Sequence, residues 1–115
     1  MTRVKRGIAT KKRHKRLLKK TKGFWGQRKN IFKSAKDTLL RAMAYATKGR
    51  KLKKRDMRAL FISRIAASAQ LNGISYSKFI HGLLVAEVKL NRKMLSQLAI
   101  FEPEAFKQLA EIAKG

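Results

Sequence analysis

Positive charge is distributed so unevenly along this chain that it divides the sequence into two halves. Residues 1–58 contain 23 Lys and Arg and two acidic residues, whereas residues 59–115 contain seven Lys and Arg and four acidic residues. Repulsion among so many like charges opposes compaction, so the first half should be extended unless an anionic partner neutralises it. The sequence therefore predicts a basic, extended arm over residues 1–58. It predicts a small globular domain, of low stability because of its size, over residues 59–115.

The composition excludes several classes of protein. The 115 residues carry a net charge of +24, include no Cys and are 44% hydrophobic. A disulfide framework and a thiolate zinc site are excluded, and the apolar content is too high for a wholly disordered chain. No apolar run approaches the roughly 18 residues of a membrane span, and the basic N-terminus lacks the apolar stretch of a secretory signal. The basic composition also continues too far for a mitochondrial presequence, so we expect an intracellular protein with a strongly anionic partner.

The pattern of residues predicts an all-α fold with a long basic helical extension. Helix-forming residues dominate, and the sole proline is Pro103. Apolar residues recur at helical spacing between residues 27 and 47, where they predict an amphipathic helix that Gly49 ends or kinks. This apolar face consists of Phe32, Ala35, Leu39, Met43 and Ala46.

Further helices are expected to form a compact bundle after the arm. An apolar pattern at four-residue spacing runs from Met57 to Ala69 and ends at Asn72-Gly73, where glycine suits a left-handed helix cap. Ser75 and Asn91 are the predicted N-caps of two following helices, and Pro103 should lie in the first turn of the last. We interpret the apolar stripes of these helices as core rather than as a ligand pocket.

No catalytic constellation is visible in the sequence. The six acidic residues are scattered, and the two histidines, His14 and His81, lie in different halves. We therefore expect no enzyme, no cofactor, no metal site and no small-molecule substrate. His14 lies within the basic run from Lys11 to Arg16 and is a candidate phosphate or base contact, whereas His81 is expected on a helix surface.

The segment Lys22-Gly23-Phe24-Trp25-Gly26 places two aromatic rings between glycines in a basic region. Such rings can stack on unpaired bases while the flexible backbone passes close to phosphates, which favours structured RNA over duplex DNA. Packing of both rings against a neighbouring helix is an equally weighted alternative. The Gly-x-x-Gly spacing matches the loop of a KH domain, but no strands are predicted beside it.

Several motifs in register make the chain resemble the bacterial-type large-subunit ribosomal protein L-twenty family. They are Arg3-Val4-Lys5-Arg6-Gly7, Arg13-His14-Lys15, the segment from Lys22 to Gly26, Asn72-Gly73-Ile74-Ser75-Tyr76-Ser77 with Phe79, and Asn91-Arg92-Lys93-Met94-Leu95. Their order and spacing match over essentially the whole chain. The resemblance implies an arm that threads between helices of large-subunit ribosomal RNA, a compact C-terminal domain, and a role in early large-subunit assembly. It also implies neighbouring large-subunit ribosomal proteins as partners, a place in the cytoplasmic ribosome and, in some bacteria, repression of the protein's own operon.

All the residues predicted to bind RNA lie within the basic arm. They are Arg3, Lys5, Arg6, Arg13, His14, Lys15, Arg16, Lys22, Gly23, Phe24, Trp25, Gly26, Arg28, Lys29, Arg50, Lys53, Lys54, Arg55 and Arg58. The second half departs from the resembled family, with Ala66 and Gln70 in place of Asn and Arg, and Leu84-Val85 in place of a commonly basic pair. We therefore expect RNA affinity to reside mainly in residues 1–58, with residues 59–115 anchoring and orienting the arm.

Two rival functions and one question of origin stay open. A DNA architectural protein would also be small, basic and helical, although no intercalating wedge or β-arm is evident. A cationic helix that binds anionic membranes is a second rival, because residues 27–47 are amphipathic. The main interpretation includes no membrane partner and no homo-oligomer, and it leaves an organellar ribosome open as the alternative to a bacterial one.

Overall fold

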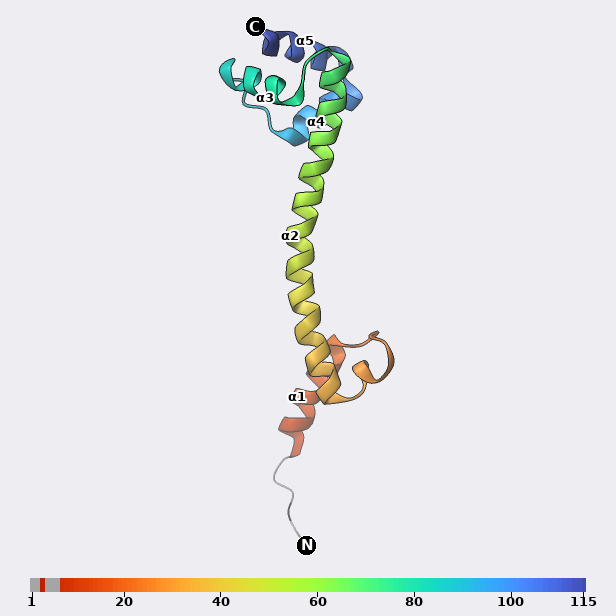
Figure 1. Cartoon of the computed structure of the whole chain (residues 1–115). Coiled ribbons are helices and arrows are strands. Elements are labelled where there is room, and N and C mark those ends of the chain that lie inside the picture. The colour runs from red at the N-terminus through yellow and green to blue at the C-terminus, as the bar shows by residue number, and fades with distance from the viewer. Residues whose placement is uncertain (1–2, 4–6) are drawn as a thin grey trace. The chain divides into compact units, whose positions relative to one another are not determined.

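The computed structural model describes residue 3 and residues 7–115. The described part is helical and contains no strand, which confirms the predicted all-α class. Its elements are α1 (Gly7–Lys20), the 3₁₀ helix η1 (Gly26–Lys29), α2 (Phe32–Leu71), α3 (Tyr76–Val85), α4 (Arg92–Phe101) and α5 (Pro103–Lys114). The chain divides into two compact units, Met1–Lys51 and Leu52–Gly115, and α2 contributes to both (Figure 1).

Helix α2 is a single helix of 40 residues, so of the two predicted alternatives at Gly49, a helix end there is wrong. It also begins later than expected, because residues 26–29 form η1. A glycine inside a helix costs only about 1 kcal/mol relative to alanine, and the surrounding Lys and Arg are good helix formers. The change in apolar pattern near residue 50 therefore alters which face is apolar without ending the helix.

Glycine ends α2 where the sequence predicted. Gly73 has φ of 73°, the left-handed conformation that residues with a Cβ rarely adopt. The backbone N–H of Ile74 donates to the Ala69 carbonyl at 3.0 Å, and that of Gly73 donates to the Gln70 carbonyl at 3.0 Å. These two bonds form a Schellman cap, which satisfies carbonyls that would otherwise lack a partner.

The first unit has a sparse core made by α1 and the beginning of α2. Among its described residues only Thr21 and Ala35 are buried, and Phe32 and Leu39 are half-buried. Met43, further along the same apolar face, is exposed. Packing therefore covers only the first turns of the predicted amphipathic face.

The second unit contains the hydrophobic core, built by α3, α4 and α5 around the end of α2 (Figure 1). Its buried residues are Ile65, Ala69, Ile74, Phe79, Leu83, Leu95, Phe106 and Ala110. The rings of Phe79 and Phe106 are stacked with centroids 5.0 Å apart, which joins α3 to α5. Most residues of the predicted stripes are buried or half-buried, as expected, whereas Met57, Ala86, Met94 and Ile112 are exposed.

Caps fix where the short helices begin. The Asn91 side chain accepts a hydrogen bond from the Met94 backbone N–H at 2.9 Å, which confirms the predicted cap of α4. Ser75 occupies the N-cap position of α3, but its side chain makes no capping hydrogen bond. Pro103 is in the first turn of α5, where its missing N–H costs nothing.

Candidate nucleic-acid interface

Helix α1 presents its cations outward because its other face packs on α2. The packing side of α1 carries His14, Leu17 and Leu18, all half-buried, and Thr21 is buried just beyond the helix end. The predicted contacts Arg13, Lys15 and Arg16 occupy the remaining circumference and are exposed. One helix thus displays several cations on one side, an arrangement that suits a polyanion.

His14 lies on the packing face rather than among the exposed cations. Its imidazole stacks on the ring of Phe32, with centroids 3.8 Å apart and an interplanar angle of 21°. One ring face is therefore occupied by an aromatic neighbour. A contact between the remaining edge of His14 and RNA stays a prediction.

The aromatic turn between α1 and α2 has a defined geometry. Gly23 and Gly26 have φ values of 95° and 60°, so both glycines hold the left-handed conformation. The Phe24 backbone N–H donates to the Thr21 carbonyl at 3.1 Å, which closes the turn after α1. The segment predicted as a break between helices is therefore an ordered turn built on two glycines.

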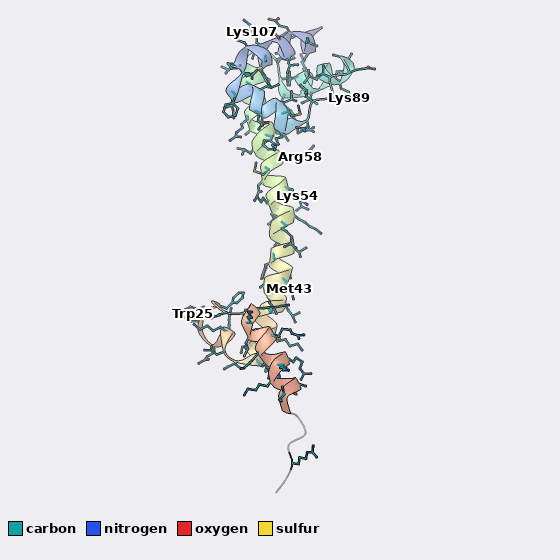
Figure 2. All side chains as sticks on the ribbon, turned by 180° about the vertical axis from the view of Figure 1, so that it is seen from behind. Trp25, Met43, Lys54, Arg58, Lys89 and Lys107 are labelled. Atoms are coloured by element: carbon teal, nitrogen blue, oxygen red, sulfur yellow. The ribbon has the colours of Figure 1, made fainter. Side chains whose placement is uncertain are left out.

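The two rings of this turn differ in exposure. Trp25 is 88% exposed and projects from the turn, whereas Phe24 is half-buried (Figure 2). The alternative that both rings pack on a neighbouring helix is thus wrong for Trp25. An exposed indole beside glycines and cations is free to stack on an unpaired base.

Basic side chains continue along an exposed stretch of α2. Every residue from 43 to 60 is exposed, and Figure 2 shows Lys54 and Arg58 projecting from this stretch. The predicted contacts within it are Arg50, Lys53, Lys54, Arg55 and Arg58. Arg50 donates a hydrogen bond to the Thr47 hydroxyl at 3.3 Å, so its guanidinium is partly oriented before any ligand binds.

The remaining predicted contacts fall in three places. Lys22, Arg28 and Lys29 are exposed at the turn and in η1. Arg3 is also exposed. Lys5 and Arg6 lie outside the described residues.

Two grooves in the first unit bring in residues that the sequence prediction missed. One, of about 500 Å³, is lined by Arg13, Arg16, Leu17, Lys20, Phe32, Lys36 and Leu39. The other, of about 470 Å³, is lined by Phe24, Arg28, Ser34, Asp37, Thr38, Arg41, Ala42 and Tyr45, and we call it the Asp37 groove. The cations Lys20, Lys36 and Arg41 and the ring of Tyr45 were not predicted as contacts. Helical spacing on α2 from residue 34 to 45 was the signal that could have grouped the second set.

A basic hollow also lies in the second unit. It lies beside the start of α3, has a volume of about 490 Å³ and includes Lys78, His81 and Lys114 among its lining residues. His81 is exposed, as expected. In the part of the chain that the structure describes, no group of three or more His, Cys, Asp or Glu side chains could hold a metal ion, and no helix is long and apolar enough to cross a membrane.

The chain is similar to a known protein family along most of its length. The model of the family described as Ribosomal protein L20 matches residues 3–109. A large ribosomal subunit protein bL20 from Clostridium novyi (strain NT) is 54% identical over 114 residues, which are 99% of this chain and 96% of that protein. Proteins of the same name are 57% identical over 95% of both chains in Borrelia garinii subsp. bavariensis, and 52% identical over 98% of this chain and 97% of the relative in Oleidesulfovibrio alaskensis.

Proposed function

Because the chain belongs to the ribosomal protein L20 family, we propose that it is a structural component of the large ribosomal subunit that binds ribosomal RNA directly and promotes early subunit assembly. A member of a ribosomal-protein family of this kind is not an enzyme. Its place is in the ribosome, in the bacterial cytoplasm, beside other large-subunit proteins. A structured segment of its own messenger RNA would meet the same basic surface, and repression of its operon would arise in that way.

The observation that carries the proposal is the exposure of the cations of α1, of the aromatic turn and of residues 43–60 of α2. The first 58 residues hold 23 Lys and Arg against two acids, so most of these cations have no acidic partner in sequence. Each phosphate that a cation neutralises releases condensed counterions, which favours binding and makes it dependent on salt. Neutralisation also lowers the repulsion between RNA segments that must approach during subunit folding.

The aromatic turn can distinguish RNA from duplex DNA, which phosphate contacts alone cannot do. An exposed Trp25 can stack on an unpaired base or wedge against the end of an RNA helix, whereas duplex DNA presents no unpaired base. We therefore propose RNA as the preferred ligand over duplex DNA. Titration of the full chain with structured large-subunit RNA and with duplex DNA at one salt concentration tests this preference, and equal affinity would favour a DNA architectural protein.

We further propose that residues 1–58 bind RNA and that residues 59–115 anchor and orient them. Two variants of the full chain with equal loss of charge separate these roles. Replacing Arg50, Lys53 and Lys54 by Gln should lower affinity for ribosomal RNA and reduce the salt slope by about one for each lost phosphate contact. Replacing the exposed Lys78, Lys89 and Lys107 by Gln should change both quantities much less. Equal losses in the two variants would contradict the division.

The decisive cellular test is sedimentation. The protein should remain with the large ribosomal subunit after a high-salt wash. Contacts enclosed between protein and RNA, including a stacked Trp25, are screened by salt less than exposed ion pairs are. Recovery at the top of the gradient, or binding to anionic vesicles that RNA does not displace, would overturn the proposal.

A further inference from the structure

Asp37 is an unexpected residue in a surface that binds phosphates. It is one of two acidic residues in the first 58, it is exposed, and it lines the Asp37 groove together with Arg28 and Arg41. A carboxylate beside a phosphate-binding surface opposes binding unless it makes a favourable contact of its own. The groove suggests what that contact is.

Local helix chemistry does not account for Asp37. Helix α2 begins at Phe32 and has no acidic residue in its first turn, so Asp37 lies beyond the turn where the helix dipole favours a negative charge. Lys33 and Arg41 lie four residues away on either side, at the spacing of helical ion pairs. Such pairs contribute little when both partners are exposed, as these are.

The groove has the size and the lining of a site for an unpaired RNA strand. Its volume of about 470 Å³ falls within the range of about 300–1,000 Å³ typical of ligand sites. Phe24 and Tyr45 offer ring faces on which bases can stack, and Arg28 and Arg41 offer cations for phosphates. Asp37 and Tyr45 are eight residues apart on α2, about 12 Å along its axis, so the groove is longer than a single base.

We propose that the Asp37 groove binds an unpaired stretch of RNA and that Asp37 selects guanine within it, a proposal that rests on the RNA-binding function above. The Watson–Crick edge of guanine presents two adjacent N–H donors, at N1 and at the exocyclic N2. The two oxygens of a carboxylate accept from both at once. Adenine and cytosine place an acceptor nitrogen beside their amine, and uracil flanks its one N–H with two carbonyls, so each sets an acceptor against the carboxylate.

The test uses the full chain and short oligouridines that carry one central guanosine, inosine or adenosine. Fluorescence anisotropy at one salt concentration should show the guanosine oligomer binding about tenfold more tightly than the adenosine oligomer. Inosine, which lacks the exocyclic amine, should fall between them. Asp37→Asn should abolish the preference while leaving affinity for the adenosine oligomer unchanged or higher, because the variant gains positive charge.

Asp56→Asn is the matched control. Asp56 is the other acid of the first 58 residues, is exposed on the same helix and does not line the groove. The control makes the same change in charge and should keep the guanosine preference. Loss of the preference in both variants would mean that charge, not the groove, sets it.

Other outcomes separate this inference from the proposed function. Suppose that the chain binds large-subunit RNA. Guanine selection alone would then be overturned by equal affinity for the three oligomers, by no measurable binding of any oligomer, or by a preference that survives Asp37→Asn. Failure to bind large-subunit RNA as well would overturn the proposed function.

Discussion

The imidazole of His14 lies flat against the ring of Phe32, with 3.8 Å between the ring centroids. This pair joins α1 to the first turn of α2. Since only Thr21 and Ala35 are buried among the described residues of the first unit, its core is small, and this stacked pair should matter to its stability. It therefore helps to hold the cations of α1 in position on the surface that we propose binds RNA.

Replacing His14 by Ala should loosen α1. Stacked aromatic pairs contribute about 0.5–1.5 kcal/mol beyond the area they bury, so the free energy of opening α1 should fall by about that amount. Amide hydrogen exchange of residues 7–20 measures the change. His81→Ala, which removes an exposed histidine from α3, is the control and should leave exchange in α1 unaltered. Unchanged exchange in His14→Ala would mean that the stack adds nothing to stability.

Replacing Trp25 by Ala should weaken binding to structured RNA by about 1–3 kcal/mol. The slope of affinity against salt should hardly change, because no phosphate contact is lost. Filter binding over a series of salt concentrations gives both quantities. Because Trp25 is 88% exposed, the variant should fold as the parent does, and circular dichroism checks this. An unchanged affinity would remove stacking from the mechanism.

Replacing Gly82 by Ala should destabilise the second unit by about 1–3 kcal/mol. A Cβ at this position would overlap the carbonyl of Ala113 and lie 2.7 Å from its Cα, so α3 and α5 would have to move apart. Urea unfolding followed by circular dichroism measures the loss. Gly49→Ala adds the same methyl group where nothing lies within 4 Å, and it should instead stabilise α2 by about 1 kcal/mol. Equal urea midpoints for Gly82→Ala and Gly49→Ala would contradict the close approach of α3 to α5 at Gly82.

Replacing Asn91 by Ala should cost about 1 kcal/mol, because the Met94 N–H loses its acceptor. Ser75→Ala removes an N-cap residue whose side chain makes no capping bond, and it should cost less. The same urea unfolding experiment compares the two. A greater loss from Ser75→Ala would show that Ser75 caps α3 in solution.

Much of the fold was predictable because local chemistry decides it. Gly73, Asn91 and Pro103 each satisfy a requirement of a helix end, and the structure confirms all three positions. The resemblance to the ribosomal protein family is likewise confirmed, since several motifs kept their order and spacing. The sequence left open whether the helix ends or kinks at Gly49, because a change of apolar face beside a glycine resembles a helix boundary.

The candidate site was less predictable because it depends on contacts between distant residues. Nothing near His14 in sequence indicates Phe32, and nothing near Phe24 indicates that it shares a groove with Tyr45. The sequence alone identified Lys, Arg and aromatic residues as candidate RNA contacts. Which of them face a common groove depends on how α1 and the turn fold back on α2, so Lys20, Lys36 and Arg41 were missed.

The uncovered stretch of α2 from residue 43 to 60 bears on how a cell would dispose of unassembled copies. Its side chains are all exposed, so local unfolding opens bonds next to many Lys and Arg residues to proteases. We expect surplus protein to be cut first in this stretch and ribosome-bound protein to be spared. The abundance of ribosomal RNA would then set how many copies of the protein survive. The ends of the degradation fragments would show whether the first cuts fall within residues 43–60.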